Sequence, residues 1–292
     1  MRIGIGIPNT VPGSSGPLLL DWARRAEQRG FAFVSTIGRV AYQSFDSLTA
    51  LAAIAGATSR IGLLTNAVLG PTYPDAVLAK ITMSVAQLSG GRLTLGLGIG
   101  ARESDYRAAE REFAGRGAAF DRQLEFLRRA WRGDEVATGD RPGELRTVAP
   151  NDAGVTDIPV LIGGHSDQAI RRTVELADGW TGAGGGPRRA EPMIARIRDA
   201  WQQAGRAGEP RLLGLAYFCA DDKRSGDSDR YLREYYAFAG QHADTIAKGA
   251  VRTSREIRGI IDEFAAIGMN ELTFSPTVAD LDEVDRLADL VL

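Results

Sequence analysis

Residues 160–172 read VLIGGHSDQAIRR, and they contain a strand, a glycine turn and the first turns of a helix. The apolar run 160–162 is short and typical of a buried strand, and the two glycines that follow end it. Ser166 stands where a helix N-cap is expected, because helical spacing of apolar residues begins directly after it. The stretch therefore predicts one strand–turn–helix unit, the repeat from which parallel α/β folds are built.

The same unit recurs along the whole chain. Strands that alternate with helices run parallel and are joined by right-handed crossovers. Eight such units favour a closed (β/α)8 TIM barrel, of class α/β, over an open doubly wound sheet. A TIM barrel commonly uses about 250 residues as one unit, so we expect residues 1–292 to form a single domain. The strands are predicted near residues 2–7, 31–37, 60–68, 92–98, 158–162, 178–182, 211–219 and 269–275.

One segment interrupts this alternation. Residues 133–157 are rich in glycine, proline and aspartate and contain two short runs typical of strands, so we expect an insertion that folds as a hairpin. We expect the insertions of the barrel to be short and to lie at its C-terminal face. The loops expected to select the substrate are residues 8–16, 38–46, 133–157 and 221–250.

The composition excludes several classes of function. A formal net charge of −2 argues against a nucleic-acid-binding protein. Cys219 is the only cysteine, and together with His165 and His242 it shows no metal-ligand spacing, so we expect no metal site. No apolar run approaches the roughly 18 residues of a membrane span, and the first residues enter a strand pattern rather than a signal sequence. We therefore expect a cytoplasmic protein with neither a membrane nor a nucleic-acid partner.

The predicted strand ends are rich in small residues and poor in charge. In a TIM barrel these ends form the mouth that holds the active site. They do not assemble the carboxylate pair or the Ser–His–Asp set of hydrolases, but they would let a large flat ligand lie against the backbone. The N–H groups of Gly163 and Gly164, with the helix that begins after Ser166, would suit a phosphate group. The alternative is a tight turn with a capping serine and no ligand.

Three segments resemble the luciferase-like superfamily of flavin- and deazaflavin-dependent oxidoreductases. The strongest match is residues 74–100, PDAVLAKITMSVAQLSGGRLTLGLGIG. Residues 158–180, IPVLIGGHSDQAIRRTVELADGW, carry the double-glycine turn, and the third match runs from Thr253 through Pro276. Three blocks in this order, on a barrel pattern, indicate the family far more specifically than they indicate a substrate.

The resemblance implies a TIM barrel that binds FMN or the deazaflavin F420 at its C-terminal mouth. It implies a non-proline cis peptide bond beneath the cofactor ring, at Ala67–Val68, with Asn66 beside the ring. The glycine turn at 163–166 would hold the phosphate end of the cofactor. The other residues that we expect at the cofactor are Gly98, Gly100, Gly163, Gly164, His165, Ser166, Thr181 and Gly182.

The chain also departs from the family pattern. Many relatives carry a polar or acidic residue and a histidine at the end of the second strand, where this chain has Gly38 and Arg39, and Ala101 replaces an acid near the end of the fourth. The missing proton-transfer pair argues against direct alcohol oxidation. Arg39 and Tyr73 are the candidate catalytic residues. Alternatively, Arg39 binds an anionic substrate or the cofactor phosphate chain, or lies exposed in a loop, and Arg102 has the same alternatives.

Three functions remain open on the sequence. The first is an F420-dependent oxidoreductase that transfers a hydride to or from a small organic substrate. The second is an FMN-dependent monooxygenase that works with a separate flavin reductase. The third is a barrel that has lost catalysis and binds a ligand. The family resemblance also suggests a homodimer, formed through helices near residues 74–92.

Overall fold

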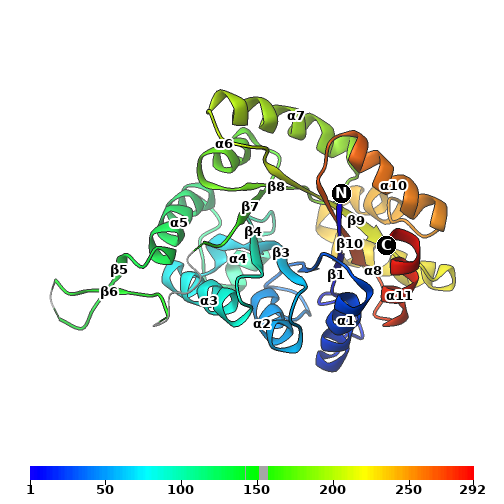
Figure 1. Cartoon of the computed structure of the whole chain (residues 1–292), viewed down its shortest axis with the longest axis horizontal. Coiled ribbons are helices and arrows are strands. Elements are labelled where there is room, and N and C mark those ends of the chain that lie inside the picture. The colour runs from blue at the N-terminus through cyan, green and yellow to red at the C-terminus, as the bar shows by residue number, and fades with distance from the viewer. Residues whose placement is uncertain (142, 151–156) are drawn as a thin grey trace.

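The computed structural model describes residues 1–141, 143–150 and 157–292, and its centre is a closed barrel of eight parallel strands. Around the barrel the strand order is β1-β10-β9-β8-β7-β4-β3-β2 (Figure 1). All eight predicted strands are confirmed, each to within two residues at either end. Their bounds are β1 Arg2–Gly6, β2 Phe33–Thr36, β3 Gly62–Leu69, β4 Leu93–Gly98, β7 Val160–Gly163, β8 Gly179–Thr181, β9 Arg211–Phe218 and β10 Glu271–Pro276.

The helices between the strands form the outer ring, and each buries an apolar face against the barrel. In α1, for example, Leu19 and Trp22 are buried, Ser15 accepts a hydrogen bond from the Leu18 N–H, and Gly30 ends the helix in a left-handed conformation. The helix α10 begins with a capping box. The ring consists of α1 Gly16–Arg29, α2 Ser47–Ala57, α3 Asp75–Leu88, α5 Arg116–Trp131, α6 Asp167–Leu176, α7 Pro187–Gln203, α10 Ser254–Ala266 and α11 Asp282–Val291.

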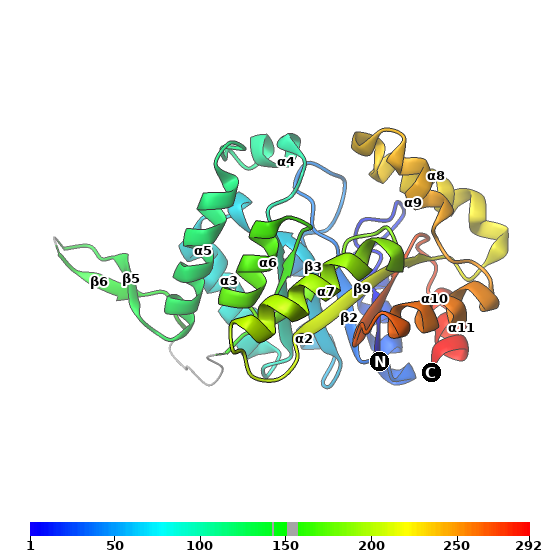
Figure 2. The same cartoon turned by 90° about the horizontal axis from the view of Figure 1, so that it is seen from above.

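Short additional elements cover the C-terminal end of the barrel, as expected. Figure 2 shows α4 and the pair α8–α9 at this end, while the chain termini lie toward the other. The helix α4 follows β4, and the larger group follows β9. These elements are η1 Gly70–Thr72, α4 Glu103–Ala108, η2 Asp222–Arg224, α8 Ser225–Tyr235, η3 Ala237–Ala239 and α9 His242–Lys248.

The insertion after α5 is an antiparallel hairpin of β5 (Glu135–Thr138) and β6 (Leu145–Thr147), as predicted. It connects the end of α5 to the start of β7, and in both views it projects sideways from the barrel (Figures 1 and 2). The expectation that residues 133–157 help to select the substrate is therefore wrong for this hairpin, because a helix-to-strand connection leaves from the end opposite the mouth. Residues 142 and 151–156 of the insertion lie outside the described residues.

The interior of the barrel is filled by side chains below the mouth. Phe33, Leu64, Leu161 and Leu213 come from four different strands and form one buried cluster. Glu271 lies near the start of its strand, where Arg2 at 2.7 Å and Arg211 at 2.9 Å neutralise it. The floor of the barrel is thus closed, and a ligand would enter from the C-terminal end. Among the described residues, no helix is long and apolar enough to cross a membrane.

Candidate functional site

A hydrogen bond across the barrel lumen marks the base of the mouth. The Thr181 hydroxyl donates to Asn66 Oδ1 at 2.6 Å, although β4 and β7 separate their strands in the sheet. Both residues are buried. Among the described residues, Asn66 Nδ2 has no hydrogen-bond partner, although it is buried. A buried amide donor without an acceptor is costly, so this one is suited to a ligand atom.

The end of β3 is irregular beside this amide. The register between β3 and β4 shifts between Thr65 and Val68, and the peptide bond Asn66–Ala67 is cis. The sequence-based position of this bond, Ala67–Val68, is wrong by one residue. Apolar periodicity does not reveal which residue of a strand bulges, whereas in the structure Thr65 Oγ1 donates to the Gly96 carbonyl at 2.8 Å and fixes where the chain departs from regular pairing.

Of the five glycines expected at the cofactor, Gly98 alone leaves open space, and Gly163 has ordinary contacts. A Cβ added at Gly98 would meet no atom within 4 Å, and one at Gly163 would meet nothing closer than 3.5 Å. Gly100 differs, because a Cβ there would lie 2.9 Å from the Leu69 side chain. Gly182 packs beside the Trp180 ring, and its N–H already donates to the Leu213 carbonyl. Gly98 therefore offers room at the rim, a Cβ at Gly163 would contact Leu97 and Thr181, and Gly100 and Gly182 serve the packing of the rim.

The turn between β7 and α6 has the conformation expected of a capped helix start. Gly164 has a φ of 127°, which favours glycine, and Ser166 Oγ accepts from the Ala169 N–H at 3.3 Å. Trp180 Nε1 donates to the Gly164 carbonyl at 2.7 Å, and the His165 ring packs edge-on against the Trp180 ring. Burial, followed by the nearby Arg189, lowers the pKa of His165, so its imidazole is neutral at pH 7.

A wall of aromatic side chains bounds the other half of the mouth. Tyr217, at the end of β9, shares a 2.6 Å hydrogen bond between hydroxyls with Tyr236, and burial raises the pKa of both phenols. Tyr42, Tyr235 and Phe238 continue the wall through edge-on and tilted ring contacts. Sequence reasoning missed Tyr217. The signal was the two-residue period of β9, which puts Tyr217 on the same face as Leu213 and Leu215.

The two candidate catalytic residues have different surroundings. The Tyr73 hydroxyl donates to Asp46 Oδ2 at 2.7 Å, and burial and Asp46 raise its pKa. Asp46 in turn caps α2, so this tyrosine lies in the packing between helices. Arg39 lies at the mouth, against the aromatic wall. Among the described residues, no group of three or more His, Cys, Asp and Glu side chains is arranged to hold a metal ion.

The sequence profile of the luciferase-like monooxygenase family matches residues 1–287. This chain belongs to the luciferase-like monooxygenase family. An uncharacterized protein of Mycobacterium tuberculosis is 32% identical over 172 residues, which are 58% of this chain and 59% of the relative. The chain thus spans less than two thirds of that relative. Pyrimidine monooxygenase RutA of Methylorubrum extorquens is 26% identical, across 97% of this chain and 86% of the relative.

The family fold is also evident in solved structures. An F420-dependent secondary alcohol dehydrogenase, solved with an F420–acetone adduct, superposes with a TM-score of 0.80 over 99% of this chain and 98% of its own. Its sequence identity of 17% shows a common fold and no more. The barrel described here is thus shared with an F420-dependent enzyme, and the family profile that matches this chain is that of the luciferase-like monooxygenases.

Proposed function

We propose that this chain binds the deazaflavin F420 at the mouth of the barrel and transfers a hydride between the cofactor and a small organic substrate. The observation that carries the proposal is the buried Asn66 amide, whose Nδ2 has no hydrogen-bond partner among the described residues, at a rim where Gly98 leaves open space. A planar ring with carbonyl and ring-nitrogen acceptors would satisfy that donor. When bound, F420 supplies or accepts the hydride.

The residues of the chain would hold and orient the ring. The Thr181 hydroxyl holds the Asn66 amide in place by donating to Oδ1, and Nδ2 remains available to a ligand. Gly98 and Gly163 would let the ring lie close to the backbone. The turn at Gly164 and Ser166, with the start of α6, would receive the phosphate end. His165 is neutral and packed on Trp180, so it would contribute a hydrogen bond rather than a charge.

FMN is the second candidate, and an FMN-dependent monooxygenase with a partner reductase is the second function. The matching profile and the similarity to pyrimidine monooxygenase RutA support it. Both cofactors carry a flat tricyclic ring and a phosphate, so the residues described above suit either one. The preference for F420 rests on the family resemblance of the segments that form β3 and β4, because the TM-score of 0.80 with an F420-dependent enzyme shows a shared fold alone.

Separate titrations with F420 and FMN, followed by cofactor fluorescence, test the proposal. We expect F420 to bind with a Kd in the micromolar range and at least about tenfold more tightly than FMN, a difference of about 1.4 kcal/mol. Tight FMN binding without F420 binding would replace the first function by the second. If neither cofactor binds at concentrations of about 100 μM, both functions are wrong.

A further inference from the structure

Two arginines from different loops meet at the mouth of the barrel. Arg39 follows β2 and Arg102 follows β4, on either side of the end of β3. Their guanidinium carbons lie 5.4 Å and 5.1 Å from the centroid of the same Tyr235 ring. The Arg39 side chain is only 10% exposed, whereas Arg102 is half-buried and keeps the pair open to solvent.

The positive charge of this pair is incompletely neutralised. Asp105 is the only carboxylate that forms an ion pair with either arginine among the described residues, and its Oδ1 is 3.9 Å from Arg39 Nε. That oxygen already accepts from the N–H groups of Val40 at 3.0 Å and Ala41 at 2.8 Å. Arg102 makes no ion pair and no hydrogen bond with any described residue. Asp105 therefore pairs with Arg39, at a distance too long for a hydrogen bond, and Arg102 has no carboxylate partner among the described residues.

Hydrogen bonding at the pair is also incomplete. The Nε atoms of Arg39 and Arg102 are buried and have no acceptor among the described residues. Arg39 reaches the carbonyls of Tyr235 and Ala41 only at 3.5 Å and 3.3 Å, which are long for hydrogen bonds. Burial, followed by the charge of Arg102, lowers the pKa of Arg39.

Aromatic rings leave the edges of these groups available. The Arg39 guanidinium lies 4.6 Å from the centre of the Tyr42 ring, and the Arg102 guanidinium lies 3.9 Å from that of Phe238. Ring contacts of this kind stabilise a cation without neutralising it. They occupy its flat face, whereas a carboxylate or phosphate binds to its N–H edge in the plane of the group.

The pair adjoins the base of the mouth. Gly38 precedes Arg39, and a Cβ added at Gly38 would lie 2.6 Å from the Ala67 carbonyl oxygen, so this loop packs directly on the end of β3. An anion on Arg39 and Arg102 would therefore lie beside the region around Asn66. We propose that the substrate carries a carboxylate or phosphate group that Arg39 and Arg102 bind, an inference that rests on the proposed function for its substrate assignment.

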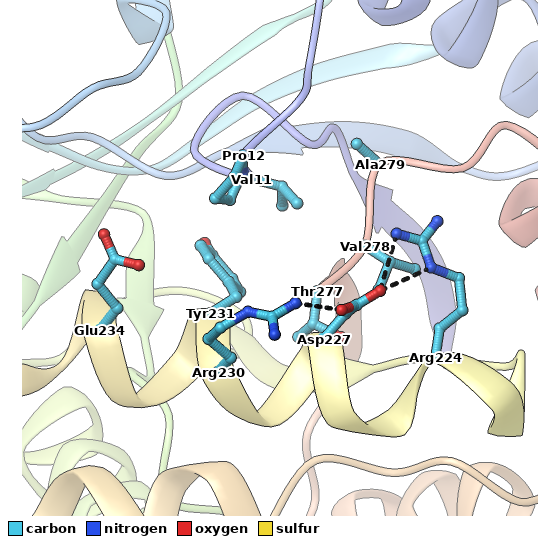
Figure 3. A pocket seen from close by; sticks show the side chains of 10 residues that line it. All are labelled: Val11, Pro12, Arg224, Asp227, Arg230, Tyr231, Glu234, Thr277, Val278 and Ala279. Carbon is cyan, nitrogen blue, oxygen red and sulfur yellow. Dashed lines mark hydrogen bonds and ion pairs between the residues drawn. The ribbon is translucent and has the colours of Figure 1, made fainter.

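A second group of charged side chains, in a pocket near the loop after β1, does not offer the same chemistry. A pocket of about 170 Å³ lies between the loop after β1 and the helix α8. Figure 3 shows that its arginines, Arg224 and Arg230, both bond to Asp227. These cations have a partner within the pocket, whereas Arg102 has none among the described residues.

Calorimetric titration of the full chain with inorganic phosphate, at constant ionic strength, tests the proposal. We expect Arg102→Ala and Arg39→Ala to weaken phosphate binding by about tenfold or more, as for the loss of a charged hydrogen bond. The matched control is Arg107→Ala in α4, because Arg107 is 76% exposed and its one ion pair within the described part of the chain is with Glu103. It should bind phosphate like the unaltered chain. Equal phosphate binding by the unaltered chain and Arg102→Ala would overturn the anion site.

An F420 titration of the same variants assigns the anion to its source. If the anion belongs to the substrate, Arg102→Ala should change the Kd of F420 by less than about twofold. A loss of F420 affinity as large as the loss of phosphate affinity would assign the site to the cofactor tail and overturn the substrate assignment. Arginine-dependent phosphate binding in a chain that binds no F420 would support the anion site while rejecting the proposed function. Circular dichroism checks that each variant is folded.

Discussion

The Asn66 amide shows how much one side chain depends on a distant one. Its Oδ1 accepts from Thr181 and its Nδ2 is left without a partner among the described residues. An amide can point either way, and only the hydrogen-bond network assigns its oxygen and nitrogen. In the structure the Thr181 hydroxyl, 115 residues further along the chain, donates to Oδ1, and this arrangement leaves the Nδ2 donor for a ligand.

Replacing Thr181→Val tests this dependence. Valine keeps the shape of threonine but removes the hydroxyl, so the Asn66 amide loses the bond that orients it. We expect cofactor affinity to fall by about two- to tenfold, in line with about 0.5–1.5 kcal/mol for a hydrogen bond. The cofactor titration described above measures this change for whichever cofactor binds.

A matched control separates cofactor binding from stability. Thr173→Val in α6 also removes a buried hydroxyl, which donates to the Ala169 carbonyl within the same helix at 2.8 Å. Both variants should unfold more easily, but only Thr181→Val should bind cofactor more weakly. If the two variants bind cofactor equally well, the Thr181 hydroxyl does not orient the amide for a ligand.

At the scale of elements, the contact between β3 and β4 places the site. Gly96 lies opposite the irregular part of β3, and a Cβ added there would overlap the Thr65 carbonyl. The missing side chain lets the two backbones come close enough for Thr65 Oγ1 to reach the Gly96 carbonyl. The position of Asn66 above the barrel interior depends on this approach.

We expect Gly96→Ala to destabilise the fold by about 1–3 kcal/mol, because overlap with backbone atoms cannot be relieved by rotating a side chain. Cofactor binding should weaken with it, since β3 must move. Gly56→Ala is the control, because Gly56 is an exposed glycine within α2 with no atom within 4 Å of an added Cβ. It should stabilise the helix by about 0.5–1 kcal/mol. Urea unfolding measures both, and equal stabilities would show that β3 tolerates the displacement.

At the scale of the whole molecule, buried tyrosine side chains at the mouth make the stability of the fold sensitive to alkaline pH. The hydrogen bond between Tyr217 and Tyr236 joins β9 to the segment after α8. Burial raises the pKa of Tyr217 well above the ordinary value of 10, and it also raises the pKa of Tyr236. Burial also raises the pKa of Tyr106, in α4, to about 12. Above pH 10 an unfolded chain would release these protons while the folded chain retains them.

The unfolding free energy should therefore fall as pH rises above about 10, with no contribution from these phenols below that pH. Tyr217→Phe should reduce the alkaline loss, because one of the retained protons is removed. Urea unfolding from pH 8 to 11, together with ultraviolet absorbance of phenolate, measures the effect. The prediction is wrong if all phenolic groups titrate near pH 10 while the unfolding free energy stays constant.

The amino-acid sequence by itself determined the barrel and its sequence of strands. Apolar spacing, glycine turns and helix caps act within a few residues, so units such as 160–172 can be recognised without knowing what surrounds them. It also predicted a mouth rich in small residues, because strand ends of parallel units must meet. These local signals did not identify which peptide bond is cis, or that Tyr73 bonds to Asp46.

Only the tertiary structure decided which rim residues face one another. Arg39 approaches Tyr235, 196 residues away, and the same ring receives Arg102 from another loop. Such contacts form only when the barrel closes and brings the ends of all eight strands to one rim. Local periodicity indicates which face of a strand a residue occupies. The distance between two residues on the rim depends instead on strand order, strand tilt and the packing of distant loops.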